Sequence, residues 1–222
     1  MKKVLIVVLL IALGSCLFAQ DYVIGDHDLL FMPTAKTIPK GTSYFSDYEL
    51  IFLNYSFGVT DRTTISAYSL FPVTDSFTET FTLSVKQNYY QYKNVNSAFW
   101  FTYVFANPFY AIGNVVSLDA KGTSLHIGLA GLGEEFSDDM GFLYMLGLKT
   151  KIGKKTDFIV EYENTDSGIE MDFDGLFFIG IRFKSKTIAW DIAGIRPMIG
   201  TADSDDSDLM FLPYLKATVF FE

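Results

Sequence analysis

The sequence predicts an all-β protein, a closed antiparallel transmembrane β-barrel of about 12 strands (10–12). Three observations predict this class. The 222 residues are 50% hydrophobic and 17% aromatic, yet only 19% charged. Short segments rich in Phe, Tyr, Val, Ile and Thr, which favour strands, recur along the chain. Beyond the N-terminus, no apolar stretch is long enough and uncharged enough for a transmembrane helix.

The chain begins with the layout of a secretory signal peptide. Lys2 and Lys3 supply positive charge, the apolar run 4–13 follows, and small residues lead to Ala19. An apolar run of this length is too short to span a bilayer, which needs about 20 residues. We therefore expect export from the bacterial cytoplasm, cleavage after Ala19, and a single barrel domain over residues 20–222.

Cys16 leaves a second interpretation of the same segment open. Residues 13–16, Leu-Gly-Ser-Cys, are similar to the lipobox of bacterial lipoproteins, in which the cysteine is lipidated. We favour removal of Cys16, because residues 17–20 offer an ordinary cleavage site directly downstream. In both cases the mature barrel has no further cysteine and no disulfide, so packing and backbone pairing must stabilise it.

Strand-like segments separated by turn residues follow from about Leu29 onward. Most have close to the 9–11 residues of a tilted transmembrane strand. The expected segments are 29–33, 43–59, 63–71, 77–90, 96–105, 111–118, 123–132, 141–152, 156–164, 176–184, 187–196 and 209–221.

Alternation with a period of two supports these segments. In residues 176–184, Phe177, Ile179 and Ile181 share one face, while Arg182 lies on the other. Bulky apolar residues on one face and small or charged residues on the other are typical of apolar-out, polar-in barrel strands. In the segment 43–59 the apolar residues do not stay on one face of the expected strand. A bulge, or an extension of the strand beyond the membrane, would explain this change of parity.

The links between the expected strands differ in length. Tight polar turns such as 60–62, 153–155 and 185–186 alternate with longer links at 133–140, 166–173 and 198–208. Short turns on the periplasmic side and longer loops outside are typical of outer-membrane barrels. With that orientation the segment from residue 43 runs inward, so an outward strand must precede it, and we assign residues 29–33 to that strand.

Several motifs carry a resemblance to a known family. They are the stretches 32–35 (Met-Pro-Thr-Ala), 39–41 (Pro-Lys-Gly), 54–62 (Asn-Tyr-Ser-Phe-Gly-Val-Thr-Asp-Arg) and 180–191, with Gly-Ile-Arg-Phe and Ile-Ala-Trp-Asp at its two ends. In order and spacing the chain resembles a family of uncharacterised outer-membrane β-barrel proteins of Bacteroidetes and related bacteria. The resemblance implies a barrel in the outer membrane and no known chemistry.

Charged residues on the expected inward parity form the candidate site. They are Lys149, Lys151, Glu161, Glu163, Arg182, Asp191 and Lys216. We expect the two lysines of segment 141–152 to pair across the turn with the two glutamates of segment 156–164, and Arg182 to pair with Asp191. These charges could form a constriction that selects small solutes. The alternative, which we favour, is a set of salt bridges that fills a narrow barrel.

Other candidate chemistry is weak. His126 lies two residues from Ser124 on one face, but no third group can be placed to complete a catalytic triad. His27 is expected to be solvated near the mature N-terminus. The acidic stretch 203–208 lacks the glycine and distal glutamate of an EF-hand loop and is expected to be a solvated loop. The sequence therefore predicts no catalytic residues, no metal site and no cofactor.

The net charge of −9 argues against nucleic acid as a partner, because nucleic-acid binders are basic. The expected partners are outer-membrane lipid, the barrel assembly machinery during insertion, and small solutes. The first functional hypothesis is a narrow pore or passive channel for small solutes. The alternatives are a structural or surface-exposed barrel with a plugged lumen and no transport and, less favoured, a lipid-modifying barrel enzyme.

Overall fold

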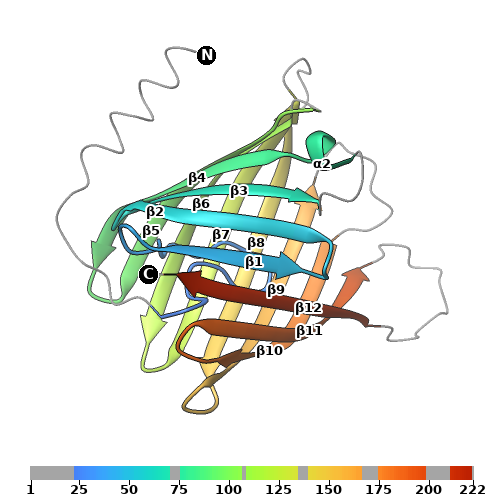
Figure 1. Ribbon diagram of the computed structural model, residues 1–222. Coiled ribbons are helices and arrows are strands. Elements are labelled where there is room, and N and C mark those ends of the chain that lie inside the picture. Colours follow the sequence, from blue (N-terminus) through green and yellow to red (C-terminus); the bar gives the residue numbers. More distant parts are fainter. Residues whose placement is uncertain are drawn as a thin grey trace.

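The computed structural model describes residues 23–70, 76–106, 109–134, 140–166, 175–198 and 211–221. They form a closed antiparallel β-barrel of 12 strands, which confirms the predicted fold class (Figure 1). The elements are β1 (Ser43–Tyr48), β2 (Phe52–Thr60), β3 (Thr63–Leu70), α2 (Ser76–Glu79), β4 (Thr82–Tyr92), β5 (Val95–Val104), β6 (Phe109–Ala120), β7 (Thr123–Glu134), β8 (Met140–Lys151), β9 (Thr156–Asp166), β10 (Gly175–Lys184), β11 (Ile188–Met198) and β12 (Leu212–Phe221).

The barrel closes between its first and last strands. β1 pairs with β12 from Ser43 opposite Phe221 to Tyr48 opposite Lys216, and every other strand pairs with its neighbours in the sequence. Closure removes the unpaired sheet edges that lipid would not tolerate. We call the end with the tight turns after β2, β4, β6, β8 and β10 the short-turn end, and the opposite end the long-link end. The start of β1 and the end of β12 lie at the short-turn end.

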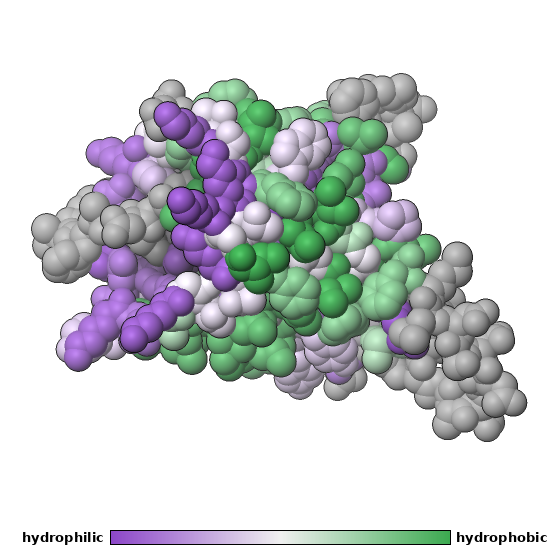
Figure 2. Space-filling view, turned by 90° about the horizontal axis from the view of Figure 1, so that it is seen from below, coloured by the Kyte–Doolittle hydropathy of each residue, from purple (hydrophilic) through white to green (hydrophobic). Residues whose placement is uncertain are grey.

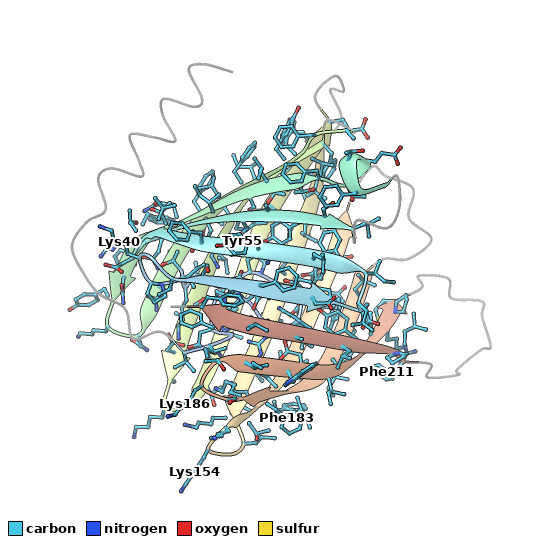
Figure 3. All side chains as sticks on the ribbon, viewed as in Figure 1. Lys40, Tyr55, Lys154, Phe183, Lys186 and Phe211 are labelled. Atoms are coloured by element: carbon cyan, nitrogen blue, oxygen red, sulfur yellow. The ribbon has the colours of Figure 1, made fainter. Side chains whose placement is uncertain are left out.

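The outer surface of the barrel carries an apolar belt. In Figure 2 a hydrophobic zone covers the middle of the visible face and borders hydrophilic side chains at the short-turn end. In Figure 3 Tyr55 and Phe183 lie on the outside of the wall. Among the exposed residues of the belt are Tyr55, Phe57, Ile65, Ile127, Leu129, Tyr144, Leu146, Phe183, Trp190 and Ile192. No helix of the described residues is long and apolar enough to cross a membrane.

The inner face of the wall is mainly small or polar, as the alternation predicted, with a few apolar side chains such as Met145, Ile159 and Phe178. In β8, Tyr144 and Leu146 are exposed on the outside, whereas Met145 and Lys149 are buried inside. The same period of two recurs along the wall, with an irregularity between Asn88 and Tyr90 of β4, so most polar positions of the wall face one lumen. The side chains that could carry function are therefore brought together from distant parts of the chain.

Two strand predictions were wrong. One predicted strand is in fact two strands and another is not a barrel strand, so the total of twelve is unchanged. Segment 43–59 is not one strand but the hairpin β1–β2, which turns at Glu49 and Leu50 with φ of 59° and 61°. This turn, rather than a bulge, explains the change of parity. β1 consequently runs from the short-turn end to the long-link end, and no outward strand is needed before it. Residues 29–33 are not a barrel strand.

Residues 29–33 belong instead to a hairpin inside the barrel. We call residues 24–38 the plug and residues 29–32 its tip. His27 O accepts a hydrogen bond from Thr34 N at 3.1 Å, Leu29 N donates to Met32 O at 2.8 Å, and Asp28 bridges to Pro33. The segment, drawn in blue in Figure 1, enters and leaves at the short-turn end before β1 begins. The lumen is thus occupied by the chain's own N-terminal segment.

Candidate functional site: the plugged lumen

One carboxylate of the wall holds the backbone of the plug tip. Glu161 accepts hydrogen bonds from Leu30 N at 3.0 Å, from Phe31 N at 3.1 Å and from Met32 N at 2.6 Å. The three donor residues lie in a narrow turn that cannot pair all its own amides, and a buried amide without an acceptor is costly. Because Glu161 is fully buried, its position on β9 fixes the depth of the tip in the barrel.

Cationic side chains of the wall hold the carbonyls of the same turn. Arg182 is bidentate to Asp191, with Nε–Oδ1 at 2.6 Å and Nη2–Oδ2 at 2.7 Å. Arg182 also donates from Nη2 to Leu29 O at 2.7 Å, from Nη1 to Asp28 O at 3.0 Å, and to Gly25 O. One guanidinium therefore joins β10, β11 and both ends of the entering arm of the plug.

Lys216 of β12 adds a second cation at the turn. Its Nζ lies 2.5 Å from Asp28 Oδ2 and 3.2 Å from the carbonyl oxygens of Leu29 and Leu30. The hydroxyl of Tyr214 donates to Leu30 O at 2.8 Å. Hydrogen bonds from both sides of the turn thus satisfy its amides and its carbonyls, which a buried turn requires.

The base of the plug, nearer the short-turn end, is held by a second ion-pair cluster. Asp26 Oδ1 lies 2.6 Å from Lys149 Nζ, and Asp26 Oδ2 lies 3.2 Å from Lys36 Nζ. Burial opposes ionisation, but the charges of Lys149 and Lys36 lower the pKa of Asp26 to about 2. The Asp26 carboxylate is therefore ionised at neutral pH and ties the entering arm both to β8 and to the leaving arm.

A chain of hydrogen bonds around His126 holds the leaving arm. Ser117 Oγ accepts a hydrogen bond from Ala35 N at 2.9 Å and lies 2.7 Å from His126 Nδ1. His126 Nε2 lies 2.9 Å from Ser124 Oγ. The Ser124–His126 proximity that the sequence suggested is thus present, but the second ring nitrogen faces the Ser117 hydroxyl, where a catalytic triad places a carboxylate. The arrangement positions the plug.

Two inward-facing glycines make room for the plug tip. A Cβ atom at Gly147 would collide with Leu29 Cδ1, and one at Gly128 would lie 2.6 Å from Met145 Cε and 3.3 Å from Met32 Cε. The apolar tip therefore packs directly on the backbone of β7 and β8. Leu29, Leu30 and Met32 have no exposed surface, so the tip completes a small apolar core inside a polar lumen.

Substituting Gly147 by valine is expected to push the tip off the wall, because the new methyl groups need the space of Leu29. The readout is the rate at which a thiol reagent labels Leu30→Cys in a Cys16→Ser background. We expect labelling to become roughly 10-fold faster, which corresponds to an overpacking cost of about 1–3 kcal/mol.

Gly131→Val is the matched control for this substitution. Gly131 lies on the outer face of β7, where a Cβ atom meets the flexible end of Met140 at 3.1 Å and Ile112 Cγ2 at an ordinary contact distance of 3.8 Å. Equal labelling rates for the Gly147 and Gly131 variants would contradict packing of the tip against Gly147.

The predicted lumen residues all lie on the barrel wall, but some of them bind other partners than the sequence predicted. Arg182 and Asp191 lie opposite each other on β10 and β11 and form the expected pair. Lys149 is not paired with Glu161 or Glu163, because the register places it opposite Ile159, and it binds Asp26 of the plug instead.

The remaining predicted residues divide between the plug and the rim. Glu161 and Lys216 bind the plug, Glu163 is buried beside Glu161, and Lys151 is exposed at the short-turn end opposite Asp157. His27 is buried, with 1% of its surface exposed, so the expectation of a solvated histidine was wrong. The Cys16 alternative and the acidic stretch 203–208 lie outside the described residues.

The sequence reasoning missed the plug and its carboxylates, Asp26 and Asp28. A signal was present, since residues 26–28 place two carboxylates and a histidine directly before an apolar turn, while four wall cations on inward parity had too few partners on the wall. The described residues contain no group of three or more His, Cys, Asp or Glu side chains that could hold a metal ion.

Two cavities flank the plug. A cavity of about 240 Å³ lies between the plug and strands β1–β5 and is lined by Phe31, Tyr44, Tyr48, Tyr68 and Trp100 among others. A larger cavity of about 780 Å³, which we call the basic mouth, lies at the short-turn end. Its charged lining consists of Lys36, Lys93, Lys121, Lys149, Lys151, Lys154, Lys155, Lys184, Lys186, Asp26, Asp119 and Asp157.

Comparison with known proteins shows only distant likeness. No family model and no curated protein sequence matches the chain. Membership of the Bacteroidetes-type barrel family therefore stays a prediction. Among solved structures, OmpF of Salmonella typhi in complex with daunomycin is 9% identical with a TM-score of 0.41, covering 77% of this chain and 61% of that one.

Two further solved structures are similar to the same degree. A structure described under asymmetric conductivity of engineered proteins is 11% identical with a TM-score of 0.42, covering 77% of this chain and 55% of that one. LpxR from Salmonella typhimurium is 10% identical with a TM-score of 0.38, covering 82% of this chain and 99% of that one. The chain spans only 55% of the engineered-protein structure and 61% of the OmpF structure, and none of these likenesses assigns it a function.

Proposed function

We propose that this protein is an outer-membrane β-barrel whose lumen is closed to passive flow by its own N-terminal plug, so that it conducts small solutes only when the plug leaves. The single observation that carries this proposal is the position of the tip. Glu161, Arg182 and Lys216, from three different strands, all bind its backbone inside the lumen.

The outer-membrane location is supported by the barrel's own surface. A closed antiparallel barrel with an apolar belt outside and a polar lumen inside meets the two conditions that a bilayer imposes, satisfied backbone groups and an apolar exterior. The signal peptide proposed for residues 1–19 would supply export. Lipid around the belt and the barrel assembly machinery are the partners that this location implies.

The space that the plug occupies inside the barrel supports the proposal that the lumen is a channel when the plug is absent. The interior contains a two-armed backbone hairpin in addition to the wall's own side chains, and cavities of about 240 and 780 Å³ remain on either side of it. A barrel filled by its wall alone would have no such room. The proposal assigns no catalytic role to His126, because both of its ring nitrogens are engaged with serines of the wall.

The test is single-channel conductance in a planar bilayer. The refolded full chain is expected to give no discrete steps, and a variant without residues 24–38 is expected to give them, because removal of the plug leaves a continuous polar lumen. Folding of each protein is checked by the shift in gel mobility that a barrel shows before and after boiling.

A second variant keeps the chain length and covers the case in which the deletion does not fold. It replaces residues 29–32 by Gly-Ser-Gly-Ser and so removes the apolar contacts of the tip. Steps of equal size in the full chain and in both variants would overturn the proposal that the plug closes the lumen. A silent deletion variant that is correctly folded would overturn the proposal of a channel.

A further inference from the structure

The basic mouth has an excess of positive charge that the protein itself does not neutralise. It contains nine lysines and three aspartates in a chain whose net charge is −9. All three aspartates are already engaged. Asp26 binds Lys149 and Lys36, Asp119 lies 3.4 Å from Lys36, and Asp157 lies 2.5 Å from Lys184.

Six lysines of the mouth have no carboxylate within ion-pair distance among the described residues. They are Lys93, Lys121, Lys151, Lys154, Lys155 and Lys186. All six are exposed, and they come from the four successive tight turns that end β4, β6, β8 and β10. In Figure 3, Lys154 and Lys186 project from the short-turn end of the barrel. Like charges gathered on one rim repel one another unless an anion lies between them.

The shape of the mouth favours a small ligand over a broad flat partner. Its volume of about 780 Å³ lies within the range of about 300–1,000 Å³ that is usual for small-molecule sites. The plug closes its floor, since Asp26 and Lys36 of the plug contribute to the lining. A ligand in the mouth is therefore surrounded by lysines on several sides.

The type of cation indicates the type of anion. The lining contains lysines but no arginine, so it offers several mobile point charges and no planar forks. Point charges of this kind suit phosphate groups. The geometry points to a binding site for a multivalent phosphate anion in the basic mouth, at the short-turn end of the barrel.

The test is isothermal titration calorimetry of the folded full chain in detergent with inorganic tripolyphosphate at low salt. We expect saturable binding of one anion per barrel that weakens steeply as salt is raised. The double variant Lys154→Glu/Lys155→Glu should bind at least about 10-fold more weakly, because it reverses two charges of the site. Lys40→Glu is the matched control, since Lys40 is an exposed lysine at the same end that does not line the mouth.

The outcomes separate the site from a general charge effect. Absence of saturable binding, or equal weakening by Lys40→Glu and by the double variant, would overturn the proposal. A second titration in nanodiscs with and without phosphatidylglycerol distinguishes two sources of phosphate. Competition by the lipid assigns the site to headgroups, and unchanged affinity assigns it to a free anion. None of these readouts depends on conductance.

Discussion

Replacing Arg182 by alanine is expected to lower the free energy of unfolding by about 3–5 kcal/mol, because it breaks a buried ion pair and leaves one partner charged. Arg182 is 1% exposed, and it holds Asp191 together with three carbonyl oxygens of the plug. Without it, Asp191 becomes a buried charge with its main partner removed. The measurement is urea unfolding in micelles, followed by the gel-mobility shift.

The double variant Arg182→Leu/Asp191→Leu separates the two parts of this effect. It removes both charges of the pair, so it should lose less stability than Arg182→Ala if the uncompensated Asp191 carboxylate is the main cost. An equal loss of stability in the two variants would mean that the main cost is the loss of the hydrogen bonds from Arg182 to the plug carbonyls. A change of less than about 1 kcal/mol for Arg182→Ala would contradict the central role of this guanidinium.

Replacing Glu161 by alanine is expected to release the plug tip and open the lumen. Three amides lose their shared acceptor, two of them in buried hydrogen bonds, and each buried unsatisfied donor costs about 1–3 kcal/mol. Because the tip can escape that cost by leaving the wall, the expected result is discrete conductance steps in the full-length variant. We also expect labelling of Leu30→Cys to be at least about 100-fold faster, which corresponds to roughly 3 kcal/mol.

Glu163→Ala is the matched control for this substitution. Glu163 lies on the same strand and the same face, two residues away, and is also buried, but it interacts with Glu161 rather than with the plug. It should leave the lumen closed and the tip protected. Conductance from both variants alike would show that loss of any lumen carboxylate opens the barrel, which would contradict a specific role for Glu161.

Sequence periodicity was sufficient to predict the wall of the barrel but not its first hairpin. The wall follows a period of two that a membrane imposes on its strands, so β3 and β5 to β12 could be located to within a few residues. The segment predicted for β4 began at residue 77, inside α2, and β4 itself begins at Thr82. The turn between β1 and β2 is different. Its positive φ angles fall on Glu49 and Leu50, which are not turn-forming residues, so the change of parity was the only sign of the reversal and it also fitted a bulge.

The candidate site was predictable in part, for a different physical reason. Inward parity identified the charges of the wall, because a side chain's face depends only on local geometry. Their partners depend on register and on the plug, and neither is local. Lys149 shows the difference, since its inward position follows from β8 whereas its bond to Asp26 joins residues 123 positions apart. Gly147 makes room for Leu29 of the plug because it has no side chain. A residue that acts in this way has no functional group by which the sequence could reveal it.

The plug also constrains the order in which the parts of the barrel can fold. The bonds that hold it join Leu30 to Glu161 across 131 residues, Leu29 to Arg182 across 153 residues, and Asp28 to Lys216 across 188 residues. Contacts this distant in the chain form slowly, because a long loop must close before any of them is made. The segment that leaves the ribosome among the first therefore waits for the last strand before it gains its full set of partners. Until β12 pairs with β1, the carboxylates and the apolar tip of the plug lack part of the wall that binds them.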